Sequence, residues 1–192
     1  MRFQRLALIG CGLMGGSFAL ALREAGLVKT IVGFSASEKT RQRAVDLKVI
    51  DQACTSVAEA VQGADLVLLA VPVGAMHASF AAMRDALQPS ALLMDVGSTK
   101  CDVIAAAQAT LGERLSCFVP AHPIAGKEVA GIDHAEATLL QAWSITFNCT
   151  ARSRVACEAL KPTMCSTAPA WRNASANEPP IRPQPISASF LK

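Results

Sequence analysis

A glycine-rich turn directly after the first apolar run restricts the fold of this chain more than any other feature. Residues 5–10, RLALIG, read as a short buried strand that ends at a glycine, and residues 13–25 read as a helix. Gly10, Gly12 and Gly15 give this turn the spacing G-x-G-x-x-G. Between a strand and a helix, that spacing is the fingerprint of a dinucleotide-binding βαβ unit.

Each glycine of the turn has an expected role. Gly10 permits the tight turn, Gly12 leaves room for a pyrophosphate, and Gly15 lets the helix pack closely on the strand. The helix N-terminus offers unpaired N–H groups and the positive end of its dipole to the phosphates. Glycines in apolar runs also mark close packing alone, but the βαβ context favours a cofactor. The expected contacts are Gly10, Cys11, Gly12, Leu13, Met14 and Gly15.

Strand-like and helix-like segments alternate as far as residue 140. Further strands are predicted at 30–34, near 53, and at 64–72, 91–97 and 116–120, and further helices at 38–47, 56–62, 74–87, 98–111 and 133–140. The strands are apolar throughout, which is typical of a parallel sheet covered by helices on both faces. We predict an α/β fold, a Rossmann-type doubly wound and mostly parallel sheet, as an NAD(P)-binding domain over residues 1–144.

Residues 145–192 differ in composition from the rest of the chain. They contain no glycine and are rich in alanine, serine, arginine and proline. Such a segment buries too little apolar surface to offset the entropy of the chain. We predict an atypical, poorly structured tail, with QAWSITFN at 141–148 in the place of a last strand.

Composition and charge exclude several classes of protein. The net charge of the 192 residues is only +3, which argues against nucleic-acid binding. No apolar run is long enough to cross a membrane. The N-terminal pattern continues through Cys11, where a signal sequence would be cleaved, so we expect a cytoplasmic protein without a membrane partner. Cys149, Cys157 and Cys165 match no common zinc spacing, so no metal site is expected.

The residues after the second predicted strand bear on the choice of cofactor. An NAD site usually has Asp or Glu there, whereas this chain has SAS at 35–37, followed by three cationic residues within 38–43. Hydroxyls and cations suit the extra phosphate of NADP, although the same cations also suit a solvated helix face. We predict NADP as the favoured cofactor and NAD as the alternative. The expected contacts here and after the strand at 64–72 are Ser35, Ser37, Thr40, Val71 and Pro72.

Two polar stretches follow later strands. DVGSTK at 95–100 and PAHPIAG at 120–126 both lie at the carboxyl ends of predicted strands, where open α/β sheets bind ligands. We therefore expect Ser98, Lys100 and His122 to converge beside a nicotinamide. Taken singly, each residue has a simpler interpretation: Ser98 as a helix cap, Lys100 as a solvated charge, and His122 as a partner in structural hydrogen bonds.

The prolines on both sides of the histidine favour a catalytic role for it. Pro120 and Pro123 restrain the backbone of His122. An imidazole that is held in place is a good proton acceptor near neutral pH. His77 and His134 have no comparable surroundings in the sequence and are assigned to helix surfaces.

Together these motifs resemble one family. GCGLMGGS (10–17), ADLVLLAVPV (64–73), DVGSTK and above all HPIAGKEVAG (122–131) are similar to the prephenate dehydrogenases, which include arogenate dehydrogenases. The resemblance covers roughly residues 3–140. It implies an NAD(P)-dependent oxidative decarboxylation of prephenate to 4-hydroxyphenylpyruvate in tyrosine biosynthesis, with arogenate as the alternative substrate.

The resemblance also implies roles for the three polar residues. His122 would hydrogen-bond the C4 hydroxyl of the substrate and draw off its proton as the carbonyl develops. Ser98 would hold the imidazole and the hydroxyl in register, and Lys100 would help to position the anionic substrate. A β-hydroxyacid dehydrogenase also has a glycine loop ending in Met-Gly, but the proline-flanked His122 argues against that class.

The resemblance stops after about residue 140. Family members continue into a helical domain that forms a homodimer and supplies an arginine for the substrate carboxylate, and this chain has no room for it. We expect a truncated chain with an out-of-frame or otherwise aberrant C-terminus and impaired activity. The alternatives are a tail that docks a partner and a nucleotide-binding remnant without catalysis.

Overall fold

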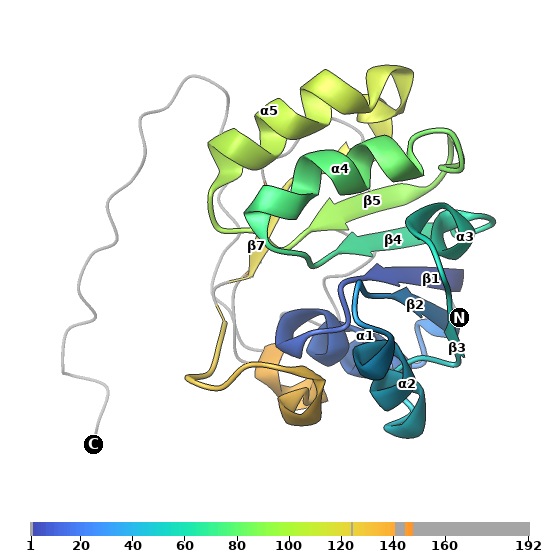
Figure 1. The fold of residues 1–192 in the computed structure, drawn as a ribbon, viewed down its shortest axis with the longest axis vertical. Coiled ribbons are helices and arrows are strands. Elements are labelled where there is room, and N and C mark those ends of the chain that lie inside the picture. Colours follow the sequence, from blue (N-terminus) through green and yellow to red (C-terminus); the bar gives the residue numbers. More distant parts are fainter. Residues whose placement is uncertain (1, 124, 141–144, 148–192) are drawn as a thin grey trace, which may run out of the picture.

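The computed structural model describes residues 2–123, 125–140 and 145–147 (Figure 1). Strands and helices alternate over most of this length, as the apolar pattern predicts. Three 3-10 turns (η1–η3) and a short strand pair follow the last α-helix. The elements are β1 (Phe3–Ile9), α1 (Leu13–Glu24), β2 (Val28–Phe34), α2 (Glu38–Asp46), β3 (Gln52–Ala53), α3 (Val57–Val61), β4 (Leu66–Leu69), α4 (Val73–Met83), β5 (Leu92–Asp95), α5 (Lys100–Thr110), η1 (Gly112–Cys117), β6 (Phe118–Val119), β7 (Ala121–Pro123), η2 (Ile132–His134), η3 (Ala137–Leu140) and β8 (Ile145–Phe147).

The main sheet is parallel and has the strand order β3-β2-β1-β4-β5-β6. The order reverses between β1 and β4, so the connections after β1 and β4 leave the sheet in opposite directions. A ligand crevice forms at such a switch point, outside the carboxyl ends of the strands. The predicted Rossmann-type, doubly wound sheet is confirmed.

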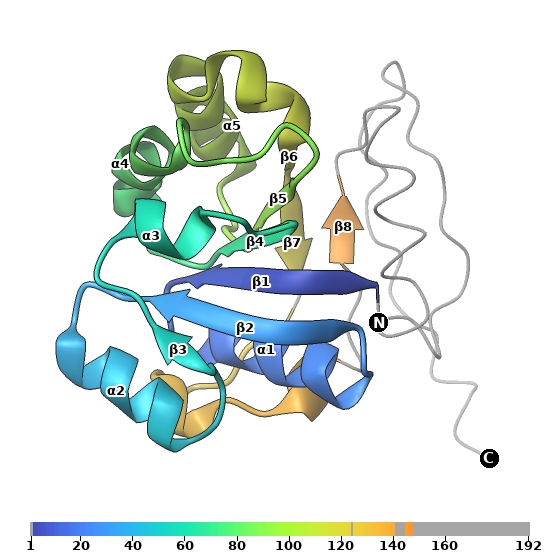
Figure 2. The ribbon, with the colours of Figure 1, turned by 90° about the vertical axis from the view of Figure 1, so that its right-hand side faces the viewer.

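Both faces of the sheet are covered. Figure 1 shows α4 and α5 over one face and α1 and α2 over the other, and Figure 2 shows α1 and α2 below β1 and β2 after a quarter turn. Successive residues of β1 point to opposite faces: Leu6 and Leu8 belong to the apolar cluster under α1, and Ala7 and Ile9 to the cluster under α4. All four are fully buried, because a parallel sheet between two helical layers has no solvent-facing side.

The region after α5 differs from the prediction. The strand predicted over 116–120 is reduced to β6, and a 3-10 helix precedes it. Residues 121–123, predicted as a loop, form β7, which pairs antiparallel with β8 in a separate sheet. Pro120 separates β6 from β7, and proline cannot donate to a strand ladder. The strand predicted within 141–148 is present over 145–147, but it pairs with β7 rather than with the main sheet.

Two predicted helices are also different in the structure. The helix predicted over 133–140 is wrong: η2 and η3 are 3-10 turns separated by extended backbone at Ala135. The helix predicted over 74–87 begins at Val73 and ends at Met83. The predicted tail over 145–192 lies almost entirely outside the described residues and stays a prediction.

Candidate functional site

The glycine turn lies between β1 and α1 at the carboxyl edge of the sheet. Gly10 has φ +102°, and a Cβ there would collide with the backbone carbonyl of Ala70 in the neighbouring β4 connection. A Cβ at Gly15 would collide with the carbonyl of Gly10. A Cβ at Gly12 would meet no atom within 4 Å, because it would project into open space. Two glycines therefore allow backbone packing, and Gly12 leaves an accessible surface beside the helix N-terminus.

This difference between the glycines gives a testable result. Gly10→Ala is expected to lower the free energy of unfolding by about 2–3 kcal/mol, because it adds a backbone collision to a left-handed conformation. Gly12→Ala is expected to lower it by at most about 1 kcal/mol, because its Cβ meets no atom and the cost is only that alanine is a poorer N-cap residue for α1 than glycine. Denaturant titration of both variants measures the two effects. Equal destabilisation by the two substitutions would contradict this account of the turn.

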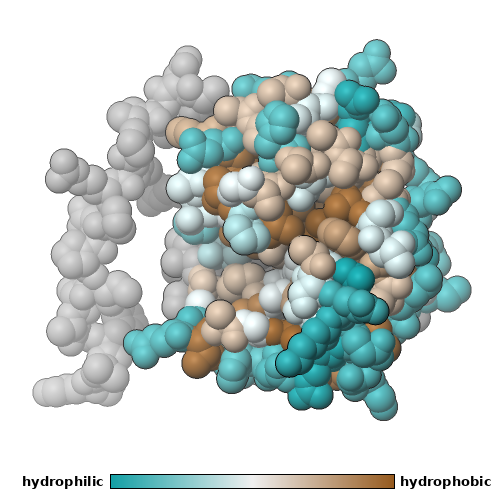
Figure 3. All heavy atoms as spheres, viewed as in Figure 1, coloured by the Kyte–Doolittle hydropathy of each residue, from teal (hydrophilic) through white to brown (hydrophobic). Residues whose placement is uncertain are grey.

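A pocket of about 530 Å³ opens from this turn. Four parts of the chain line it: the glycine turn, the β2–α2 junction, the β4–α4 junction with the first turns of α4, and the segment at 131–133. In Figure 3 the strongly hydrophilic surface of α2 borders a paler, more hydrophobic centre of this face. Of the residues predicted to contact a cofactor, the lining includes Gly10, Cys11, Gly12, Ser35, Thr40, Val71 and Pro72.

Four predicted contacts do not line this pocket. Gly15 packs beneath the turn, and Leu13 and Met14 are half-buried in the first turn of α1. The hydroxyl of Ser37 accepts a hydrogen bond from the N–H of Thr40 at 3.2 Å and so caps α2. The structure thus brings the ends of β1, β2 and β4 together around one pocket. Seven of the eleven residues predicted to contact a cofactor line it.

Cys11 lies in the wall of the pocket with a buried thiol. Its Sγ donates a weak hydrogen bond to the carbonyl oxygen of Phe34 at 3.7 Å. Burial raises the pKa of the Cys11 thiol to about 12. The thiol is therefore neutral at physiological pH, and Cys11 contributes packing and shape rather than nucleophilic chemistry.

A segment far along the chain completes the pocket. Residues 131–136 dock on α1, where a Cβ at Gly16 would lie only 2.6 Å from the Ile132 side chain. The buried hydroxyl of Ser17 accepts a hydrogen bond from the N–H of Glu136 at 3.0 Å. Sequence reasoning missed both residues, although the pair Gly16-Ser17 directly follows the fingerprint. Gly16 and Ser17 therefore hold the segment at 131–136, which forms one wall of the pocket, against α1.

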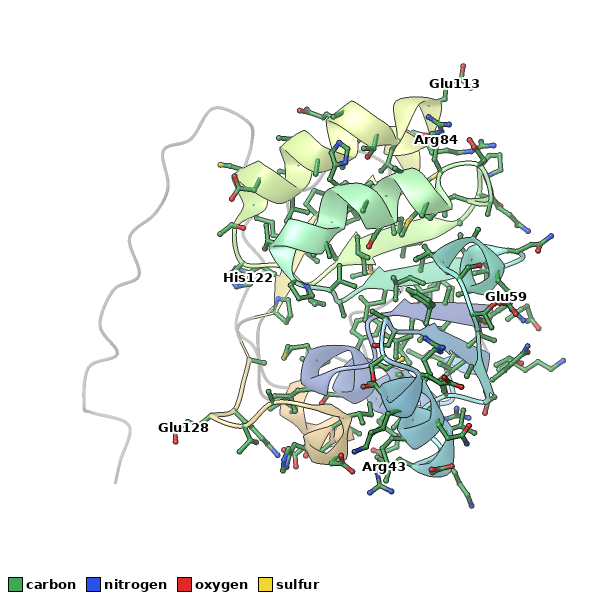
Figure 4. The ribbon with its side chains drawn as sticks, in the orientation of Figure 1. Arg43, Glu59, Arg84, Glu113, His122 and Glu128 are labelled. Carbon is green, nitrogen blue, oxygen red and sulfur yellow. The ribbon has the colours of Figure 1, made fainter. Side chains whose placement is uncertain are left out.

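The residues predicted for catalysis lie along the same carboxyl edge. Figure 4 shows His122 at this end of the sheet, on β7 beyond the ends of β4 and β5. His122 is half-buried and Ser98 is exposed. Neither the imidazole nor the Ser98 hydroxyl forms a hydrogen bond with another described residue. The hydrogen-bonding capacity of both groups is therefore not used within the described part of the chain.

Lys100 is held by a buried carboxylate that sequence reasoning missed. Its ammonium pairs with Asp95, which is 0% exposed, and donates to the carbonyl oxygen of Ala121 at 2.6 Å. Asp95 also accepts from the N–H of Gly97 at 2.8 Å and from the N–H of Ala121 at 3.1 Å. Both backbone groups of Ala121, the residue before His122, are thereby fixed to the end of β5. The one trace of this buried carboxylate in the sequence is a single acidic residue at the end of the apolar run ALLMD, residues 91–95.

The sequence matches the nucleotide-binding domain of prephenate dehydrogenase over residues 18–150. The chain belongs to the prephenate dehydrogenase family. It is 40% identical to cyclohexadienyl dehydrogenase of Zymomonas mobilis over 139 residues, which are 72% of this chain and 47% of that protein. It is 34% identical to prephenate dehydrogenase of Bacillus subtilis, over 71% of this chain and 37% of that protein. The chain therefore spans less than half the length of these two relatives.

Solved structures of prephenate dehydrogenases have the same fold. Prephenate dehydrogenase of Aquifex aeolicus, solved in complex with hydroxyphenyl propionate and NAD+, matches with a TM-score of 0.76 at 29% identity. The matched region is 85% of this chain and 58% of the Aquifex aeolicus chain. Arogenate dehydrogenase of Synechocystis has a TM-score of 0.73 at 27% identity, with 83% and 57% covered. This domain of the prephenate dehydrogenase family is thus present with its nucleotide-binding architecture.

The described residues contain neither a helix suited to span a membrane nor a group of side chains suited to bind a metal ion. None of the helices there is both long and apolar enough to cross a bilayer. Within the same residues, no three His, Cys, Asp or Glu side chains are grouped so that they can hold a metal ion.

Proposed function

We propose that this chain binds a nicotinamide dinucleotide in the pocket and carries out the oxidative decarboxylation of prephenate to 4-hydroxyphenylpyruvate. The observation that carries the proposal is the placement of His122. Its strand is fixed by Asp95 and Lys100 at the carboxyl edge that also forms the pocket. The Aquifex aeolicus relative, solved with NAD+ and a hydroxyphenyl compound, supports the same assignment.

The pocket fits the diphosphate of such a cofactor. Gly12 presents no side chain to the open space beside α1, and the leading N–H groups of a helix favour a phosphate there. Ser35 and Thr40 line the part of the pocket at the end of β2, where the adenosine ribose binds in this fold. No carboxylate follows β2 directly, and Lys39 and Arg43 line this part, so we propose NADP as the preferred cofactor.

The residues of the β5 and β7 ends supply the acid–base chemistry. When bound, the oxidised nicotinamide provides the hydride acceptor. The imidazole of His122 hydrogen-bonds the ring hydroxyl of prephenate and accepts its proton as the C4 hydride leaves and the carbonyl forms. When the ring carboxylate leaves as CO2, its electron pair passes through the ring to that oxygen, and the imidazolium returns the proton to give the phenol. The hydroxyl of Ser98 orients the imidazole and the substrate hydroxyl. Lys100 acts as a positioning residue, because two of its donors already hold Asp95 and Ala121.

Arogenate is the second candidate substrate. It differs from prephenate only in carrying an amino group in place of the side-chain keto group. The TM-score of 0.73 to Synechocystis arogenate dehydrogenase favours its inclusion in the test. The ring chemistry proposed for His122 is the same for both substrates.

The test is turnover by the purified full chain. Prephenate or arogenate is supplied with NADP or NAD, and the reduced cofactor is followed by absorbance while the aromatic product is identified by chromatography. We expect reduced cofactor and aromatic product in equal amounts with prephenate and NADP. Binding of a dinucleotide by calorimetry without any turnover would instead assign this chain a nucleotide-binding role and overturn the proposed catalysis.

A further inference from the structure

An ion pair spans one side of the pocket, at the end where β2 meets α2. The Nε atom of Arg43 in α2 lies 2.6 Å from Oδ1 of Asp133 in η2. Both residues line the pocket, and both side chains are about half exposed, at 49% and 54%. Ninety residues separate them in the sequence. Among the described residues that line this pocket, the one carboxylate comes from a segment remote from β2.

The position of Asp133 is set by the docking of its segment. Ile132 packs against Gly16 of α1, and the N–H of Glu136 donates to the buried Ser17 hydroxyl. The residues on both sides of Asp133 are thus attached to α1. Asp133 is held opposite Arg43 by the fold, not only by the attraction between the two charges.

The other cations at this end of the pocket are differently engaged. The guanidinium of Arg41 donates to the carbonyl oxygen of Ser35 and lies over the Phe34 ring, 5.8 Å from its centroid. Lys39 forms no ion pair with any described residue. Arg43 is therefore the cation whose availability to a ligand depends on a protein carboxylate.

We propose that Asp133 sets the cofactor preference of this chain by competing with a 2′-phosphate for Arg43. This inference rests on the proposed function, which places the adenosine ribose at the end of β2. NADP carries a phosphate at the ribose 2′ position, where NAD has a hydroxyl, and an arginine near the end of β2 accommodates that phosphate in this fold. Arg43 offers that phosphate a planar two-donor fork, but its Nε donor and part of its charge are already taken up by Asp133, so the carboxylate and the phosphate compete for one guanidinium. The carboxylate also repels the phosphate directly.

The test is titration of the full chain and its variants with NAD and with NADP by calorimetry. Asp133→Asn is expected to strengthen NADP binding about fivefold, the factor that corresponds to an exposed ion pair at the upper end of its range. Arg43→Gln is expected to weaken NADP binding about tenfold, as for loss of a charged hydrogen bond. NAD binding is expected to change less than about twofold in both variants, since its ribose hydroxyl carries no charge.

A double variant tests whether the two residues act through each other. In the Arg43→Gln background, Asp133→Asn is expected to strengthen NADP binding by clearly less than fivefold, because the competition for Arg43 no longer exists and only the direct repulsion of the phosphate by the carboxylate is relieved. Glu136→Gln is the matched control. It removes the exposed Lys127–Glu136 ion pair of the same segment, and Glu136 does not line the pocket.

The outcomes separate this inference from the proposed function. Equal changes in NAD and NADP affinity in Asp133→Asn, or the same shift in Glu136→Gln, would overturn the inference and leave the dinucleotide assignment intact. Failure of the unsubstituted chain to bind either dinucleotide would overturn both. Because binding is measured directly, absence of turnover with prephenate contradicts only the proposed reaction.

Discussion

Lys100→Met is expected to lower the free energy of unfolding by about 2–4 kcal/mol, a cost typical of breaking a buried ion pair. The carboxylate of Asp95 is fully buried and accepts from Lys100 and from two backbone N–H groups. Methionine fills a similar space but leaves that charge without its cation. The Lys100 side chain is 22% exposed, so solvent recovers part of the loss. Denaturant titration of the full chain measures the change.

The matched control is Lys127→Met. It removes an ion pair with Glu136 whose side chains are 34% and 44% exposed, so the expected loss is at most about 1 kcal/mol. Asp95→Asn combined with Lys100→Met is expected to cost less than the sum of the two single changes, because the residues share one network. If Lys100→Met and Lys127→Met destabilise the chain equally, the buried pair does not have the structural role assigned to it.

The same network connects Lys100 to β7, the strand that carries His122. The N–H of Ala121 is bonded to Asp95, and its carbonyl oxygen is bonded to Lys100. In Lys100→Met we therefore expect hydrogen exchange at Ala121 to accelerate more than exchange at the buried amides of β1, which accelerate only by the factor set by the loss of global stability. Equal acceleration at Ala121 and throughout the sheet would indicate general destabilisation instead of local release of β7.

The main sheet and the glycine turn could be predicted from the sequence because their signals are local. Continuous apolar runs mark strands buried on both faces, and three glycines at fixed spacing mark one turn between a strand and a helix. Gly10 shows why this works: its φ of +102° and its contact with Ala70 are imposed by the turn itself. Short-range constraints of this kind leave a trace in a single sequence.

The features that the sequence did not reveal depend on partners far along the chain. Asp95 meets Ala121 across 26 residues, Ser17 meets Glu136 across 119, and Arg43 meets Asp133 across 90. No periodicity links such pairs, because the fold alone brings them together. The 3-10 turns at 132–140 were missed for a related reason. Their apolar residues follow helical spacing, but η3 packs against α1, with Leu140 in the apolar cluster there, from a turn only four residues long.

His122→Asn is expected to lower kcat for the proposed decarboxylation by about 10²–10⁴-fold, the usual range for loss of a general base. Asparagine is similar in size and hydrogen-bonds a hydroxyl, but it cannot accept the proton that leaves as the carbonyl forms. His122 does not line the dinucleotide pocket, so the Kd for NADP is expected to change less than about twofold. Initial rates with saturating prephenate, together with calorimetry, separate the two quantities.

The controls distinguish the imidazole's chemistry from a disturbance of the fold. His77 lies exposed on α4, and His77→Asn is expected to retain full turnover. Ser98→Ala is expected to reduce kcat less than His122→Asn does. In the double variant the Ser98 effect is expected to be largely lost, because a residue that orients the base has no effect once the base is gone. Additive losses at Ser98 and His122 would place the serine in a separate role. Full activity in His122→Asn would mean that another group takes the hydroxyl proton, and the assignment of β7 as the catalytic strand would be wrong.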